Sequence, residues 1–101
     1  MKSDESLTWI LYDISNNKTR RHVVKACQEA GLYRVQKSVF LGTVKHNRLD
    51  ELSMRIEDQI DEETDSVYIF PMCAMDFRKV ILQGQAFDQK MVTDDVRNLF
   101  L

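Results

Sequence analysis

The order in which strand-like and helix-like segments alternate constrains the fold of this chain more than any other feature. Residues 7–14 are apolar and rich in Trp, Ile, Leu and Tyr, which predicts a buried strand. Residues 15–17 favour a turn and a helix N-cap, residues 18–30 carry apolar side chains at helical spacing, and Gly31 stands where a C-cap glycine belongs. Residues 33–44 then alternate, as one long strand or as two short strands with a break or bulge near residues 36 and 37.

The second half of the chain continues this alternation. Asn47 opens a predicted helix whose exposed face is filled by acidic residues. The other face of this helix carries an apolar stripe made of Leu49, Leu52, Ile56 and Ile60. Residues 66–72 predict another strand, which ends near Pro71 or lies on an edge of the sheet. Residues 77–82 predict a fifth, shorter strand that Gly84 ends.

This order, βαββαβ with an extra C-terminal strand, predicts a ferredoxin-like α+β fold in which two helices cover one face of an antiparallel sheet. The length of 101 residues predicts one domain, which we place at residues 1–84. Residues 85–101 form a tail whose apolar end is expected to dock on the dimer or on a partner. Such a small domain buries a modest core, so oligomerisation would add stability. The fold alone leaves function open.

The composition excludes several classes of protein. Hydrophobic residues make up 44% and charged residues 30%, which is typical of a soluble globular domain. No apolar run approaches the roughly 20 residues that span a bilayer, and the polar N-terminus does not resemble a signal peptide. Cys27 and Cys73 leave a disulfide or a metal pair open, but two buried free thiols fit the usual habits of cytosolic cysteine better. We therefore expect a cytoplasmic protein with no membrane partner.

Charge is distributed unevenly along the chain. Residues 1–48 carry nine Lys and Arg against four Asp and Glu, whereas residues 49–101 carry five against twelve. This split favours one basic and one acidic face, unless folding mixes the two halves. Basic residues gather on the first predicted helix and the strand after it: Lys18, Arg20, Arg21, Lys25, Arg34 and Lys37. They form either a solvated face or a surface that contacts phosphates independently of sequence.

Asp13 is the candidate catalytic and metal-binding residue, because it ends an otherwise apolar strand. A carboxylate there must lie at the mouth of the sheet, pair with a cation or bind one, since burying a bare charge is costly. Asp13 either caps the turn before the first helix or binds a divalent metal near a phosphodiester. One carboxylate is too few for a metal site, but a second protomer would bring a second Asp13, and magnesium accepts such sparse ligation.

Other motifs that would indicate a specific chemistry are missing from the sequence. It has no glycine-rich phosphate loop, no Cys-x-x-Cys and no His-Glu-x-x-His helix. Tyr33 and Phe40 could stack on bases, as aromatic residues do in RNA-binding ferredoxin-like domains. The glycine-aromatic strand signature of those domains is absent, so packing in the core is the better interpretation of both residues.

Several short segments occur in an order and spacing that resembles a known family. They are Tyr12-Asp13-Ile14-Ser15, Arg20-Arg21, Gly31, Arg34-Val35-Gln36-Lys37-Ser38-Val39-Phe40 and Asp65-Ser66-Val67-Tyr68-Ile69. Together they resemble the second CRISPR-associated protein family ("Cas two") over roughly residues 7–84. The Arg-Val-Gln-x-Ser-Val-Phe string is the specific part of this resemblance.

The resemblance implies a ferredoxin-like homodimer that works with the CRISPR-associated integrase ("Cas one"). In that family the dimer bridges integrase dimers and binds the duplex spacer precursor during spacer acquisition. Several relatives are described as magnesium-dependent nucleases on RNA or duplex DNA. The resemblance maps the metal-linked aspartate onto Asp13, the neighbouring arginines onto Arg20 and Arg21, and the family's Ser-Val-Phe motif onto Ser38 to Phe40.

Three functions follow from these observations. The first is a magnesium-dependent endonuclease, with the integrase or independent of it, in which two Asp13 carboxylates face each other across the dimer and hold the metal. The second is a scaffold for spacer acquisition, in which the basic side chains bind duplex DNA. The third is a generic RNA-binding domain, which the missing stacking signature disfavours. We favour the scaffold, with nuclease activity as an additional expectation.

Overall fold

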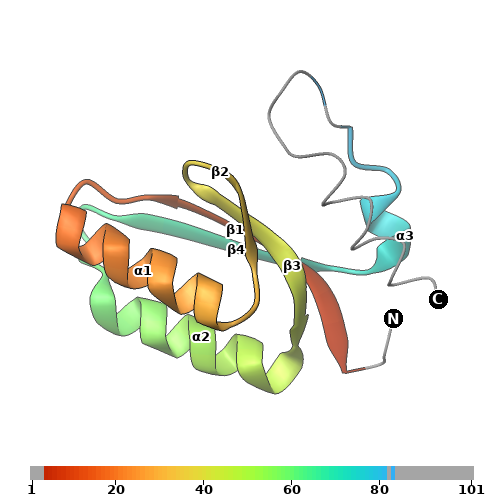
Figure 1. Cartoon of the computed structure of the whole chain (residues 1–101), viewed down its shortest axis with the longest axis horizontal. Helices are drawn as coiled ribbons and strands as arrows, with labels where there is room; N and C mark the ends of the chain where they lie inside the picture. The colour runs from red at the N-terminus through yellow and green to blue at the C-terminus, as the bar shows by residue number, and fades with distance from the viewer. Residues whose placement is uncertain (1–3, 82, 84–101) are drawn as a thin grey trace.

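The computed structural model describes residues 4–81 and residue 83 of the chain (Figure 1). Its elements in chain order are β1 (Glu5–Asp13), α1 (Asn17–Glu29), β2 (Tyr33–Gln36), β3 (Val39–Lys45), α2 (His46–Gln59), β4 (Ser66–Met72) and the short α3 (Ala74–Phe77). The predicted segment at residues 33–44 is therefore two strands, and their pairing is irregular between Arg34 and Gln36. The predicted order of the first six elements is confirmed.

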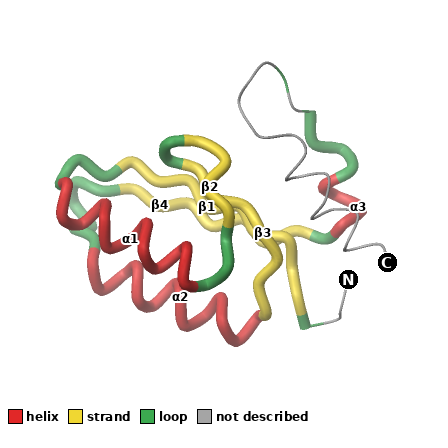
Figure 2. The backbone as a smooth tube through the Cα atoms, viewed as in Figure 1, coloured by secondary structure: helices red, strands yellow, loops and turns green. Residues whose placement is uncertain are grey.

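The four strands form one antiparallel sheet in the order β2-β3-β1-β4. Helices α1 and α2 lie side by side along the sheet (Figure 2). This arrangement confirms the predicted ferredoxin-like α+β pattern. Pro71 lies in β4, an edge strand, as expected of a residue that cannot donate a hydrogen bond to a neighbouring strand.

One face of the sheet packs against α1 and α2. Ile10 and Tyr12 of β1 share this face because alternate side chains of a strand point the same way. Phe40 of β3, which pairs with Ile10, is fully buried there. The helices add the apolar side chains of Val23, Ala26, Cys27, Leu52 and Ile56 to this core. Phe40 therefore belongs to the core, as the sequence predicts.

The opposite face of the sheet, here called the open sheet face, is only partly covered. Leu7 and Trp9 of β1 form a second cluster with Val35, Leu41 and Phe77, and the rings of Trp9 and Phe77 lie 6.0 Å apart. Phe77 brings α3 onto this face. Further along β4, Tyr68 and Phe70 are 57% and 47% exposed. Their register opposite Leu11 and Trp9 puts them on the open sheet face.

The start and the end of α1 follow simple rules. Asn16 is the N-cap, and its side-chain oxygen accepts a hydrogen bond from the Thr19 amide at 3.0 Å. Gly31 follows the C-cap residue with a positive φ of 88°, which glycine adopts at little cost. The C-cap prediction is confirmed, and the N-cap lies within the predicted turn.

Two expectations from the sequence are wrong. The fifth strand predicted at residues 77–82 is absent from its described part, residues 77–81, where α3 ends and turns follow. The amides of Lys79 and Val80 donate to the carbonyls of Asp76 and Phe77, each three residues earlier, as in a turn. Phe77 and Val80 therefore pack on the second cluster at a spacing of three residues, whereas a strand would place every second residue there. Cys73 is exposed, so only one of the two free thiols is buried. The predicted docking of residues 85–101 lies outside the described residues.

Candidate nucleic-acid interface

Asp13 ends β1 on the open sheet face. Its alternation with Leu11 and its pairing with Ser66 put its side chain on that face, and the side chain is exposed. Asn16, not Asp13, caps α1, so the capping interpretation of Asp13 is wrong. Within residues 4–81 and 83, no hydrogen bond or ion pair holds the Asp13 carboxylate. This carboxylate is available to a cation or a partner.

Arg20 reaches back from the first turns of α1 to the end of β1. Its Nη1 donates to the carbonyl of Ile14 at 3.0 Å, and its Nη2 donates to the side-chain oxygen of Asn17. Arg20 is half-buried, and its guanidinium is held by the loop that joins β1 to α1. The loop therefore fixes one positive charge next to the end of β1.

The turn between β2 and β3 approaches the same point from the other side. The backbone amide of Tyr12 donates to the carbonyl of Ser38 at 3.1 Å, which ties the turn to β1. A shallow hollow of about 280 Å³ results, here called the β1-end hollow. It is lined by Tyr12, Asp13, Ile14, Arg20, Lys37 and Ser38. Four of the predicted site residues, Asp13, Arg20, Lys37 and Ser38, therefore meet in one place.

The remaining predicted basic residues of α1 occupy two different positions. Lys18 and Arg21 are exposed near the N-terminal end of the helix, the end nearest the hollow. Lys25 lies farther along and forms an ion pair with Glu29 at 3.9 Å. Together with His22, Arg55 and Gln59, it lines a separate hollow between the helices. Lys25 is therefore not part of the β1-end hollow.

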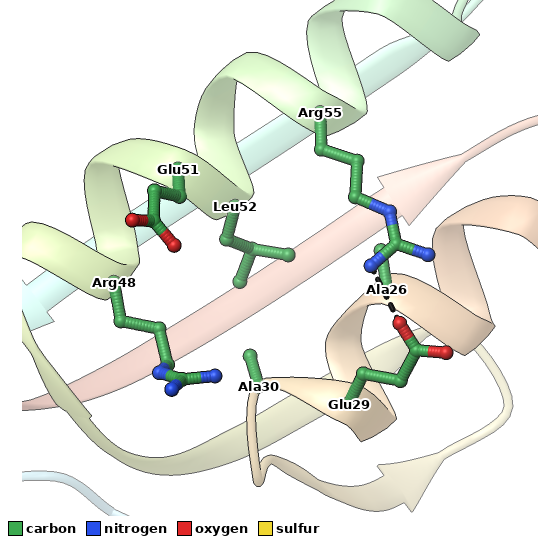
Figure 3. A pocket seen from close by; sticks show the side chains of 7 residues that line it. All are labelled: Ala26, Glu29, Ala30, Arg48, Glu51, Leu52 and Arg55. Atoms are coloured by element: carbon green, nitrogen blue, oxygen red, sulfur yellow. Dashed lines mark hydrogen bonds and ion pairs between the residues drawn. The ribbon is translucent and has the colours of Figure 1, made fainter.

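The groove between α1 and α2 is lined by side chains of the two helices where they pack together. Ala26, Ala30 and Leu52 form its floor, and Arg48 points towards it from α2 (Figure 3). Arg55 of α2 donates to the Glu29 carboxylate at 2.6 Å, and this guanidinium lowers the pKa of Glu29 below 4.5. Figure 3 shows that ion pair joining the two helices. None of the functional residues predicted from the sequence lines this groove, although Lys25 lies nearby through its ion pair with Glu29.

Arg34 of β2 is exposed, but its guanidinium is occupied within the chain. Its Nη2 and Nε donate to the carbonyl of Lys37 at 2.7 and 3.1 Å. The Tyr12 hydroxyl donates to the same carbonyl at 2.8 Å. Reasoning from the sequence missed Tyr12 as a site residue, although it stands beside Asp13 in the resemblance. Its position in the string Tyr12-Asp13-Ile14-Ser15 was the available signal.

One protomer offers little to a divalent metal. No group of three or more His, Cys, Asp or Glu side chains gathers to hold a metal ion anywhere in residues 4–81 and 83. Asp13 is the single carboxylate that lines the β1-end hollow, beside the hydroxyl of Ser38. Magnesium is commonly bound through one or two carboxylates with water completing the shell. Asp13 supplies one such carboxylate, and the rest of a magnesium shell would have to come from water or from another molecule. Across the same part of the chain, no helix is long and apolar enough to cross a membrane.

Comparison with known proteins gives a consistent result. The family model described as "CRISPR associated protein Cas2" matches residues 6–80. A relative from Desulforudis audaxviator, named CRISPR-associated endoribonuclease Cas2, is 42% identical over 70% of this chain and 67% of its own length. A relative from Halalkalibacterium halodurans, named CRISPR-associated endonuclease Cas2, is 41% identical over 63% of this chain and 71% of its own length.

Solved structures agree with the sequence relatives. The crystal structure of Streptococcus pyogenes Cas2 at pH 6.5 superposes with a TM-score of 0.66 at 31% identity, covering 77% of this chain and 99% of that one. The hypothetical protein TT1823 from Thermus thermophilus superposes with a TM-score of 0.64 at 28% identity, over 68% of this chain and 83% of that chain. The sheet and the two long helices are therefore shared with proteins of known structure.

Proposed function

This chain belongs to the CRISPR-associated protein Cas2 family, and from that premise we propose that it acts in spacer acquisition. In this proposal a homodimer binds duplex spacer-precursor DNA and bridges the CRISPR-associated integrase. The supporting observation is the group of cationic side chains around the end of β1. Arg20 and Lys37 line the β1-end hollow, and the exposed Lys18 and Arg21 flank it. These charges suit a phosphate backbone, whose binding depends on charge and not on base sequence.

The open sheet face supports the homodimer. Tyr68 and Phe70 stack in parallel on this face with ring centroids 6.3 Å apart, and about half of each residue is exposed. Tyr33, on the far strand β2, is also exposed, and Leu11 and Val39 are half-buried. Exposed apolar surface of this kind marks an interaction site. A two-fold axis through this face would pair the sheets and bring the two Asp13 side chains to the same interface.

The duplex-binding proposal is tested through its salt dependence. Arg21→Gln combined with Lys37→Gln should weaken binding and reduce the slope of log K against log salt by about two, one for each lost phosphate contact. Lys45→Gln with Arg48→Gln is the matched control, because both cations are exposed and lie away from the hollow. Lys45 ends β3, whereas the hollow lies where β3 begins, and Arg48 follows in the first turn of α2. An unchanged slope in the first variant, or an equal loss in the control, would contradict the proposed surface.

The bridging role is tested separately with the cognate integrase. Size-exclusion chromatography with light scattering should show a complex of this dimer with two integrase dimers. Adding duplex DNA is expected to stabilise the complex, because both proteins would contact one duplex. Separate elution at micromolar concentrations, with and without duplex, would remove the bridging role and leave the DNA-binding role intact.

A second candidate function is magnesium-dependent cleavage of RNA or duplex DNA. The exposed Asp13 carboxylate, without a partner in the described chain, supports it, and both curated relatives above carry nuclease names. Two Asp13 side chains would hold the ion, while Arg20 and Lys37 would neutralise phosphate charge. A bound magnesium ion supplies electrostatic stabilisation of the charge that develops on the phosphate.

Asp13→Asn tests this second function. Magnesium-dependent cleavage of single-stranded RNA and duplex DNA should disappear in the variant and in the presence of a chelator. Asp50→Asn, an exposed carboxylate on α2, is the control and should keep wild-type activity. Both variants should keep the wild-type stability within about 0.5 kcal/mol, because exposed substitutions change little. Equal cleavage by wild type and Asp13→Asn would leave Asp13 without a catalytic role.

A further inference from the structure

The turn between β2 and β3 is held at the β1-end hollow by four hydrogen bonds to two successive carbonyls. The carbonyl of Lys37 accepts three hydrogen bonds, one from the Tyr12 hydroxyl at 2.8 Å and two from Arg34 at 2.7 and 3.1 Å. The next carbonyl, that of Ser38, accepts from the Tyr12 amide at 3.1 Å. Two neighbouring backbone groups of the turn are therefore fixed to β1 and β2 at once.

The two donors also support each other. The Tyr12 ring is buried and packs against Phe40, with ring centroids 6.3 Å apart, so its hydroxyl has a fixed position. The Arg34 Nη2 lies 3.4 Å from that hydroxyl. A planar guanidinium that donates through two of its nitrogens to one acceptor is oriented more strictly than a lysine ammonium could be. Charged donors also make stronger hydrogen bonds than neutral ones.

We propose that Tyr12 and Arg34 form a clamp that positions the Lys37–Ser38 turn at the hollow that Asp13 also lines, and that Arg34 acts through this turn and not by contacting phosphate. With both carbonyls held, the side chains of Lys37 and Ser38 line the hollow beside Asp13. Tyr12 and Arg34 are positioning residues in this proposal. The positioning role rests on the proposed nucleic-acid function, whereas the clamp itself can be measured without any ligand.

Amide hydrogen exchange measures the clamp directly. The amide of residue 12 donates to the Ser38 carbonyl, so its protection reports how firmly the turn is held. Tyr12→Phe removes one hydroxyl, and Arg34→Lys keeps the charge but loses the paired donors. Each should speed exchange at residue 12 by about three- to tenfold, as the loss of one ordinary hydrogen bond predicts. Arg21→Lys, on the exposed face of α1, should leave this exchange unchanged.

Duplex binding then tests whether the clamp acts through the turn. Tyr12→Phe changes no charge, yet it should weaken binding about three- to tenfold, and its effect should be clearly smaller in a Lys37→Ala background. Arg34→Lys should match Tyr12→Phe in affinity and keep the wild-type salt slope.

The outcomes that overturn the proposal are distinct. Unchanged exchange at residue 12 in both variants would overturn the clamp. Faster exchange with unaltered binding by Tyr12→Phe, or additive effects of Tyr12→Phe and Lys37→Ala, would overturn the positioning role. If the wild type bound no duplex, the proposed function would fail, and the exchange data alone would still decide whether the clamp exists.

Discussion

Asp13 and Cys27 show how strongly the environment of a single side chain decides its chemistry. Asp13 is exposed at the end of β1, so water solvates its charge and the carboxylate can accept a cation. Cys27 is completely buried on the inner face of α1, and burial raises its pKa from 9.0 to about 12. Since the thiolate is the reactive form, Cys27 is an inert core residue. Cys73 is exposed, and its thiol donates to Asp76 at 3.2 Å.

Cys27 should make stability depend on pH in the alkaline range. Its pKa in the folded protein lies above that in the unfolded chain, so the unfolded chain loses its proton first as the pH rises. The contribution of the Cys27 thiol to the free energy of unfolding is complete below pH 9 and is lost between pH 9 and about 12. Within that range it falls by up to about 1.4 kcal/mol per pH unit. Urea unfolding at pH 8 and pH 10.5 should therefore show a smaller advantage of wild type over Cys27→Ala at the higher pH.

The control for this prediction is Cys73→Ala, which removes the exposed thiol. Its difference from wild type in free energy of unfolding should be small at both pH values. An advantage over Cys27→Ala that stays constant between pH 8 and pH 10.5 would show that Cys27 does not titrate differently in the two states.

At the scale of one element, the start of α1 links helix stability to the candidate site. The Asn16 side chain satisfies the Thr19 amide, and the Asn16 carbonyl accepts the Arg20 amide at 2.9 Å. The same turn directs the Arg20 guanidinium to the carbonyl of Ile14. The first turn of α1 therefore holds Arg20 at the β1-end hollow. Disrupting this turn would lower the stability of the helix and would also release Arg20 from the candidate site.

Asn16→Ala should lower the free energy of unfolding by about 1 kcal/mol, because the Thr19 amide loses its capping partner. Duplex affinity should fall with it, since Arg20 loses its fixed position. Asn16→Asp keeps a capping oxygen and should retain the stability of the wild type. Chemical unfolding monitored by circular dichroism checks the first expectation. Equal stability of the Ala and Asp variants would show that the cap contributes nothing.

At the scale of the whole molecule, the two faces of the sheet differ in how they are covered. Helices α1 and α2 bury one face around Phe40, whereas the open sheet face is partly covered by α3 and exposes Tyr68 and Phe70. The β1-end hollow lies at the end of β1 where Asp13 stands on the open sheet face. A partner on that face would therefore adjoin the candidate site.

Tyr68→Asp with Phe70→Asp should convert the proposed dimer to monomers at micromolar concentration, because each protomer would bring two carboxylates into an apolar interface. Sedimentation equilibrium measures the change. Met54→Asp is the control: Met54 is 66% exposed but lies on α2, away from the open sheet face. An unchanged dimer in the double variant would exclude this face as the interface.

The sequence by itself determined the elements, because local rules govern them. The apolar β1, the helical spacing of α1 and α2, Gly31 with its positive φ, and Pro71 in an edge strand all follow from periodicity and backbone preference. The same rules failed after β4. The apolar residues of the segment 77–82 are Phe77, Val80, Ile81 and Leu82, a pattern too short to distinguish a strand from a helical turn. The packing of Phe77 and Val80 on Trp9 and its neighbours decided the conformation.

Only the tertiary structure decided which basic residues belong together. Lys18 to Lys37 are one group in the sequence, but folding brings Arg20 and Lys37 to Asp13, pairs Lys25 with Glu29, and turns Arg34 onto the Lys37 carbonyl. The reason is physical: helix and strand periods fix which way a side chain points, whereas its partners come from segments far away in the chain. The Tyr12 hydroxyl reaches the Lys37 carbonyl because β1 lies beside β3 in the sheet, a neighbourhood that no local pattern of residues encodes.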